Sequence, residues 1–106
     1  MSSSFSSRVW ELALSIPEGR VTTYGAIAKA AGGTLMASRS ISAILGKAPN
    51  QKAIPWHRIV YAGGKVWLSP EHEKKRRAFY KREGIKVNEK GIITNFEEVL
   101  WDPSEY

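Results

Sequence analysis

The chain has no cysteine and only two histidines among its 106 residues. Without cysteine there is no disulfide framework, no thiol nucleophile and no Cys-based zinc site. Because His57 and His72 are too few for a zinc site built from histidines alone, the composition argues against a metalloenzyme. No apolar run approaches the roughly eighteen residues of a membrane span and there is no signal peptide, so we expect no membrane partner. The length predicts a single domain, residues 1–106, with one core.

Acidic side chains are missing from the middle of the chain. Residues 36–64 carry four basic side chains and no acid, and residues 65–90 carry nine basic and four acidic ones. Residues 91–106 reverse the sign, with four acids and no base, within a net charge of +6. This segregation favours a polyanion such as nucleic acid as the partner, although many small basic proteins simply expose Lys and Arg to solvent.

Three helices are predicted in the first half of the chain. Ser6 or Ser7 can cap the first, whose apolar residues recur at helical spacing, and Thr22 or Thr23 can cap the second. The predicted ranges are Tyr24 to Ala31 for the second helix, ended by Gly32 and Gly33, and about Met36 to Lys47 for the third. Short helices joined by a Gly-containing turn in a basic chain are the outline of a helix-turn-helix.

The third predicted helix has two different faces. Its core face is formed by Ala37, Ile41, Ile44 and Leu45. Arg39 lies opposite, flanked by Ser42, Ala43 and Gly46. Small neighbours let the backbone approach another surface closely while one long cation reaches beyond it. We therefore interpret Arg39 as a probe for a narrow groove, with an ordinary solvated arginine as the alternative.

The second half of the chain predicts two hairpins around a polar helix. Gly63-Gly64 between β-prone runs is typical of a two-residue hairpin turn, and residues 85–87 and 92–94 suggest a second hairpin. The helix, Glu71 to Arg82, contains the run Lys74 to Arg77, which is either a phosphate-contact patch or a solvated face. The acidic tail is expected to pack on the body through Phe96, Leu100 and Trp101.

The stretch Ile54 to Val60 joins these halves. It is an apolar strand interrupted at Pro55, which we expect at the end of a strand or at a turn. Trp56, His57 and Arg58 follow in succession. Taken alone, they fit a core tryptophan with a hydrogen-bonded histidine as well as they fit a binding site.

Together these segments resemble the C-terminal domain of the O6-alkylguanine-DNA alkyltransferases over Val9 to Gly84. The matching motifs are Ile16-Pro17-Glu18-Gly19, Thr23-Tyr24-Gly25, Arg39, Pro55-Trp56-His57-Arg58-Ile59-Val60 and Glu83-Gly84. In the Pro-Cys-His-Arg-Val signature of those enzymes the cysteine accepts the alkyl group, and here Trp56 replaces it. In having this replacement and a short chain, the sequence resembles the alkyltransferase-like proteins. The implied fold is mainly α with small β hairpins, a winged-helix-like helix-turn-helix of the alkyltransferase C-terminal type.

The resemblance also implies residue roles. Tyr24 and Arg39 would flip the nucleotide, Tyr24 at the 3′ phosphate and Arg39 in the vacated stack. The small residues Ala37, Ser38, Ser40 and Ser42 would permit a close minor-groove approach. Trp56, Tyr24, Ile59 and Ser69 would line the lesion pocket. His57, Arg58 and Glu83 would support the site, with no catalytic residue because indole is no substitute for a thiolate.

The implied function is recognition of O6-alkylguanine in duplex DNA without repair, followed by handover to nucleotide excision repair. No cofactor or metal is expected, the protein would be a monomer, and it would reside in the bacterial cytoplasm, at the nucleoid, or in a eukaryotic nucleus. Ala48 and Ser69-Pro70-Glu71 depart from the enzymes' pattern at the far wall of the pocket. The alternative is a helix-turn-helix transcription regulator or architectural protein reading base edges. A glycosylase would need Glu83 as its carboxylate.

Overall fold

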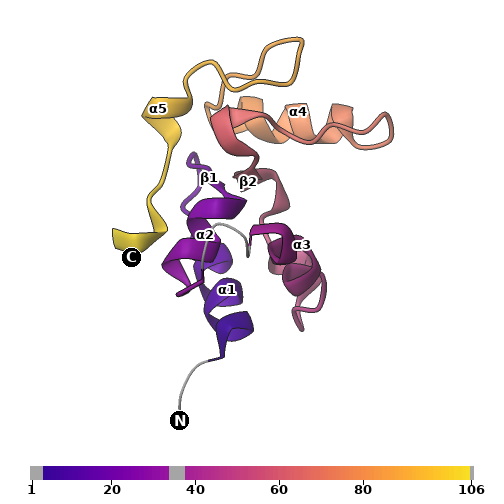
Figure 1. The fold of residues 1–106 in the computed structure, drawn as a ribbon. Helices are drawn as coiled ribbons and strands as arrows, with labels where there is room; N and C mark the ends of the chain where they lie inside the picture. Colours follow the sequence, from indigo (N-terminus) through magenta and orange to yellow (C-terminus); the bar gives the residue numbers. More distant parts are fainter. Residues whose placement is uncertain (1–3, 34–37, 106) are drawn as a thin grey trace.

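The computed structural model describes residues 4–33 and 38–105. In Figure 1 the N-terminal helices lie below a short strand pair, and the helix over residues 73–82 lies across the top. The helices are α1 (Phe5–Leu14), α2 (Tyr24–Ala30), α3 (Ser38–Gly46), α4 (Glu73–Arg82) and the short α5 (Phe96–Val99). The strands are β1 (Thr22–Thr23) and β2 (Ile59–Val60), and 3₁₀ turns are η2 (Gln51–Ala53), η3 (Trp56–Arg58), η4 (Ala62–Gly64) and η5 (Pro103–Glu105). The mainly helical class is confirmed.

Local sequence signals explain how the first helices begin and end. Ser4, and not Ser6 or Ser7, caps α1, because its extended backbone lets Oγ accept the Ser7 N–H at 3.1 Å. Thr23 caps α2 as predicted, accepting the Ala26 N–H at 3.0 Å. Gly32 follows α2 with φ +97°, a left-handed conformation that glycine adopts at little cost. The predicted start of α3 at Met36 lies outside the described residues.

Two hydrophobic cores, and not the single core that the length predicted, meet at the strand pair. The first packs α1, α2 and α3 together, with Ile41 and Leu45 of α3 fully buried. The second lies under α4 and the loops that follow it. Successive side chains of a strand point to opposite faces, so Ile59 of β2 packs into the first core and Val60 into the second. β1 and β2 pair in parallel, an arrangement that the sequence did not predict.

The first predicted hairpin needs a correction. Tyr61 and Lys65 form a single antiparallel bridge, and the loop between them holds three residues, Ala62 to Gly64, not the Gly-Gly pair alone. The Gly64 N–H donates to the Tyr61 carbonyl at 3.0 Å, which closes a 3₁₀ turn inside this longer loop. The second hairpin is present, with a bridge between Val87 and Ile93.

The C-terminal segment docks by its backbone. Val21 N–H donates to the Val99 carbonyl at 2.9 Å, and Trp101 N–H donates to the Val21 carbonyl at 2.7 Å. Along such an extended segment side chains alternate, so Val99 is buried and Trp101 half-buried while Leu100 is 42% exposed. Packing was predicted correctly for Phe96 and Trp101 and wrongly for Leu100. Within the described residues no helix is long and apolar enough to cross a bilayer.

Candidate functional site

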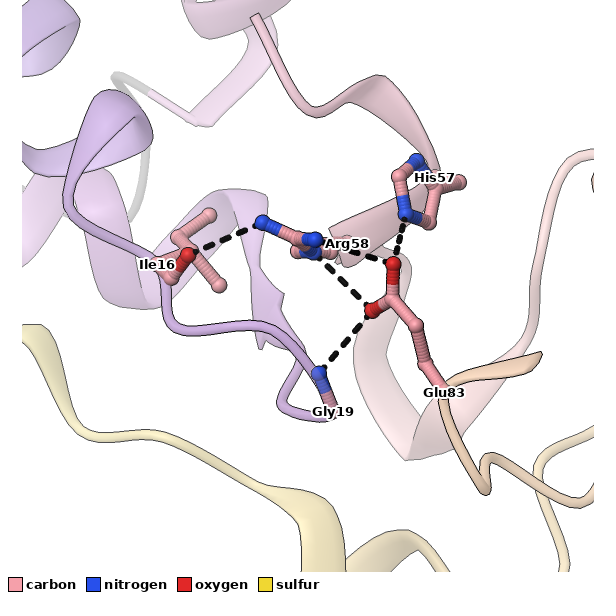
Figure 2. Close-up of polar contacts among 5 residues, drawn as sticks. All are labelled: Ile16, Gly19, His57, Arg58 and Glu83. Atoms are coloured by element: carbon pink, nitrogen blue, oxygen red, sulfur yellow. Dashed lines mark hydrogen bonds and ion pairs between the residues drawn. The ribbon is translucent and has the colours of Figure 1, made fainter. Parts of the chain in front are cut away.

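The turn η3 presents His57 and Arg58 to one carboxylate, that of Glu83 at the end of α4. His57 Nε2 lies 2.7 Å from Glu83 Oε2. The Arg58 guanidinium donates to both carboxylate oxygens, at 3.0 and 2.9 Å, and to the Ile16 carbonyl at 3.2 Å. Figure 2 shows the carboxylate between the two side chains. These contacts fix η3 between the two halves of the molecule.

A glycine turn completes the network. Gly19, with φ +84°, donates its N–H to Glu83 Oε1 at 3.0 Å (Figure 2). The positive φ favours glycine, and a Cβ on this residue would sit only 3.3 Å from the Glu83 carbonyl oxygen and crowd it. The Ile16-Pro17-Glu18-Gly19 motif thus has a physical purpose, which is to deliver one backbone donor to the buried carboxylate.

The electrostatics keep Glu83 ionised. Burial of its carboxyl raises the pKa, but hydrogen bonds from Arg58, Gly19 and His57 outweigh that effect and lower the pKa to about 2. The pKa of His57 is lowered, chiefly by burial, against the raising effect of its hydrogen bond to Glu83. The imidazole also stacks on Phe79, with ring centroids 4.7 Å apart. Glu83 therefore serves as a permanent anion that orients its neighbours, and His57 is held rigidly.

Trp56 forms one wall of a cleft of about 470 Å³. Its half-buried indole packs against the first core on one side. Pro55, with φ −82° and ψ 71°, turns the chain immediately before it, as predicted. The residues that line the cleft are Tyr24, Trp56, Tyr61, Trp67, His72 and Arg76. A large aromatic surface with one permanent cation is suited to a flat ring system.

Of the four predicted pocket residues, Tyr24 and Trp56 line this cleft, whereas Ile59 and Ser69 do not. Ile59 is only 3% exposed, because its position in β2 directs it into the first core. Ser69 lies beside a lining residue, with its Oγ 2.8 Å from Nδ1 of His72. Its contribution is to orient a residue that does line the cleft.

Three further residues that line the cleft, Tyr61, Trp67 and Arg76, were not predicted to do so. Tyr61 and Trp67 belong to the β-prone runs on either side of Gly63-Gly64, for which the sequence predicted only a hairpin. In the structure Trp67 is 44% exposed, an unusual position for an indole. Arg76 was one of four residues in the run Lys74 to Arg77. Its Cζ lies 5.0 Å from the Trp67 ring centroid, whereas Arg77 donates to Glu73 at 2.8 Å. Adjacent residues of a helix point in different directions, so Arg76 and Arg77 lie on different surfaces of α4. This spacing could have separated the two arginines from the sequence alone.

Tyr24 connects the cleft to the helical half. It is the first residue of α2, and its ring lies 5.5 Å from that of Tyr61. Burial, and to a lesser degree the charge on Tyr61, raises its pKa, so the phenol remains protonated at neutral pH. Its hydroxyl is therefore a hydrogen-bond donor at the edge of the cleft.

The outer face of α3 is small and basic. Arg39, Ser40 and Ser42 are exposed, opposite the fully buried Ile41 and Leu45. Ser38 begins the helix, and Ala37 lies outside the described residues. The Trp10 indole N–H donates to the Ile44 carbonyl at 2.8 Å, which anchors α3 to α1.

Helices α2 and α3 pack against each other, and Gly32 ends α2 at the start of the connection between them. Two helices in this arrangement define a helix-turn-helix domain. The family model described as "6-O-methylguanine DNA methyltransferase, DNA binding domain" matches residues 4–85. The chain belongs to this family and is of its alkyltransferase-like type.

Named relatives and one structure agree with this membership. The DNA base-flipping protein of Escherichia coli K12 is 41% identical over 100 residues, which cover 93% of this chain and 75% of that protein. Alkyltransferase-like protein 1 of Schizosaccharomyces pombe is 25% identical over 104 residues, which cover 93% and 95%. The structure of S. pombe Atl1 with damaged DNA containing O6-carboxymethylguanine has the same fold, with a TM-score of 0.71 at 24% identity over 92% of this chain and 94% of that one.

Proposed function

We propose that this protein recognises O6-alkylguanine in duplex DNA by flipping the nucleotide into the cleft beside Trp56, and that it transfers no alkyl group. The observation that carries the proposal is the position of Trp56. Trp56 directly precedes His57, which contacts Glu83. Its indole forms a wall of an aromatic cleft. A base taken out of the stack needs such a surface to replace the lost stacking.

The relatives support the flipping step. One is named for base flipping and another was solved on damaged DNA. In the proposed sequence of contacts, α3 enters the minor groove, where Ser40 and Ser42 leave room for the backbone. Arg39 fills the space that the flipped nucleotide vacates, and the Tyr24 hydroxyl donates to the adjacent phosphate. Ala37 and Ser38 belong to the same proposed contact.

The absence of catalysis follows from the chemistry of Trp56. An indole carbon or nitrogen is a poor nucleophile towards an alkyl carbon, and the chain contains no cysteine. Glu83 and His57 retain an arrangement that could activate a neighbouring thiol. With Trp56 beside them, they have only a structural role, in which Arg58 participates.

A mobility-shift titration with paired duplexes, with and without one O6-methylguanine, tests the proposal. We expect tighter binding to the modified duplex, together with an unchanged protein mass after incubation. Equal affinity for the two duplexes would contradict lesion recognition, and a mass gain of one methyl group would contradict the absence of transfer.

We also propose the later fate of the complex: the bound monomer marks the lesion for nucleotide excision repair. The support is the family resemblance, and a coupled incision assay with purified excision proteins tests it. A sequence-specific regulator is the competing function. Selection from random duplexes that returned one defined site, with no preference for O6-methylguanine, would favour it. The exposed α3 residues named above, one arginine and two serines, are few for major-groove readout.

A further inference from the structure

The cleft that Trp56 lines also contains a cation whose role the proposed function does not explain. Arg76 is half-buried and lines the cleft with its guanidinium over the Trp67 ring, 5.0 Å from the centroid. None of the ion pairs within residues 4–33 and 38–105 includes Arg76. Arg58 and Arg77, in contrast, each bind a carboxylate.

The surroundings of Arg76 are fixed. It lies one turn after His72, the N-cap residue of α4, so both residues face the same side. The His72 ring lies 5.4 Å from that of Trp67, and its Nδ1 is engaged by Ser69. Burial raises the pKa of the Tyr80 hydroxyl, and the nearby Arg76 guanidinium opposes part of that rise. Arg76 is thus held by its aromatic neighbours and not by an anion.

The cleft offers no internal counter-ion. None of its lining residues is an aspartate or glutamate. Glu83, the carboxylate of the network described above, already accepts hydrogen bonds from Arg58, His57 and Gly19. A half-buried guanidinium stacked on an indole still presents N–H donors along its edge, and those donors match a carboxylate in a bidentate manner.

We propose that Arg76 is an anion-binding position in the lesion cleft, and that it gives the protein a preference for O6-adducts ending in a carboxylate over neutral adducts of similar size. The inference rests on the proposed function, since it requires the modified base to enter the cleft. A methyl group makes no use of the Arg76 donors. A carboxylate that enters the cleft loses water, and Arg76 replaces those lost hydrogen bonds.

The same chemistry could serve a phosphate of the flipped nucleotide. The two sources differ in what they predict. A carboxylate contact affects only the adduct that carries the charge. A phosphate contact affects every duplex and changes the salt dependence of binding by about one counterion.

The test measures dissociation constants for duplexes containing O6-carboxymethylguanine, O6-(2-hydroxyethyl)guanine or guanine, at two salt concentrations. The variants are Arg76→Gln, Arg76→Lys and, as a matched control on the same helix, Arg77→Gln. We expect Arg76→Gln to weaken carboxymethyl binding about 10- to 100-fold more than hydroxyethyl binding. Arg76→Lys should recover part of the difference, and Arg77→Gln should leave the ratio of the two affinities unchanged.

An unchanged carboxymethyl-to-hydroxyethyl ratio in Arg76→Gln would overturn the proposal. If that variant also weakened all three duplexes equally and lowered the salt dependence, Arg76 would be a phosphate contact. Binding of the hydroxyethyl duplex is the internal control for folding. Failure of the proposed function itself would look different, because the unaltered protein would then bind hydroxyethylguanine and guanine duplexes equally.

Discussion

His57 Nε2 lies 2.7 Å from Glu83 Oε2, and the same carboxylate accepts two hydrogen bonds from Arg58. The Glu83 side chain is only 4% exposed, and its remaining oxygen capacity is used by the Gly19 N–H. The carboxylate therefore joins the α1–α2 turn, η3 and α4 at one point. In a protein whose two cores meet at a two-residue strand pair, this junction also holds Trp56 in position.

The junction makes stability dependent on acid. The folded-state pKa of Glu83 is about 2, below the ordinary value of 4.5, so its stabilising effect is fully present above about pH 4.5 and is lost as the pH falls towards 2. A shift of that size corresponds to roughly 3 kcal/mol. The pKa of His57 is also lowered in the folded state, so its protonation below the ordinary value of 6.5 further decreases the stability of the fold as the pH falls. Urea unfolding midpoints measured from pH 7 to pH 3 should show this decline.

The variant Glu83→Gln should be destabilised by about 3 kcal/mol at pH 7, because it leaves Arg58 partly buried without its counter-ion. Its stability should also vary less between pH 5 and pH 3 than that of the unaltered protein. Glu73→Gln is the matched control. It removes the exposed i,i+4 pair with Arg77, and we expect a change of about 0.5 kcal/mol or less. A similar loss of unfolding free energy in both variants would show that the buried Glu83–Arg58 pair stabilises the fold no more than the exposed pair does.

Replacement of Trp56 should separate lesion binding from general DNA binding. Base–aromatic stacking contributes about 1–3 kcal/mol, so we expect Trp56→Ala to weaken binding to an O6-methylguanine duplex about 5- to 150-fold. Binding to the unmodified duplex should change little, and Trp56→Phe should lose less because it keeps an aromatic face. Fluorescence anisotropy with both duplexes measures the effect. A uniform loss on both duplexes would mean that Trp56 supports the fold and not the lesion.

The helices and their amphipathic faces were predictable because capping and apolar spacing are local. Ile41, Leu45 and Thr23 occupy the predicted positions for that reason. The contacts that build the cleft are not local. Arg76 reaches Trp67, and Tyr61 reaches Tyr24, only after β2 pairs with β1 and α4 folds back. No spacing rule relates those residues.

The difference is clearest at Ser69 and His72. The family resemblance indicates where a pocket lies, and on that basis Ser69 was predicted to line it. The side chain that does so is that of His72, whose ring Ser69 orients through a contact of 2.8 Å. Sequence alone does not distinguish a residue that lines a cleft from a neighbour that contacts it.

The Tyr24 hydroxyl and ring can be tested separately. Because burial raises its pKa, the hydroxyl stays protonated and can donate to a phosphate at neutral pH. Tyr24→Phe should therefore weaken binding about fivefold on modified and unmodified duplexes alike, the effect of one hydrogen bond. Tyr24→Ala should cost more on the modified duplex, since the cleft also loses a wall. If Tyr24→Phe selectively weakened lesion binding, the hydroxyl would contact the flipped base instead.

We expect Arg39 to contribute to nucleotide flipping through its side-chain bulk as well as its positive charge. If its side chain fills the vacated stack, it offsets an unstacking cost of a few kcal/mol, so Arg39→Ala should weaken lesion binding at least about tenfold. It should also abolish the fluorescence increase of a 2-aminopurine at the target position. Lys47→Ala is the control, because Lys47 is an exposed cation directly after α3. A cation that only contacts phosphate lowers affinity for all duplexes and reduces the salt dependence by about one counterion. Equal losses for the two variants, with 2-aminopurine fluorescence retained, would therefore show that Arg39 contributes charge alone.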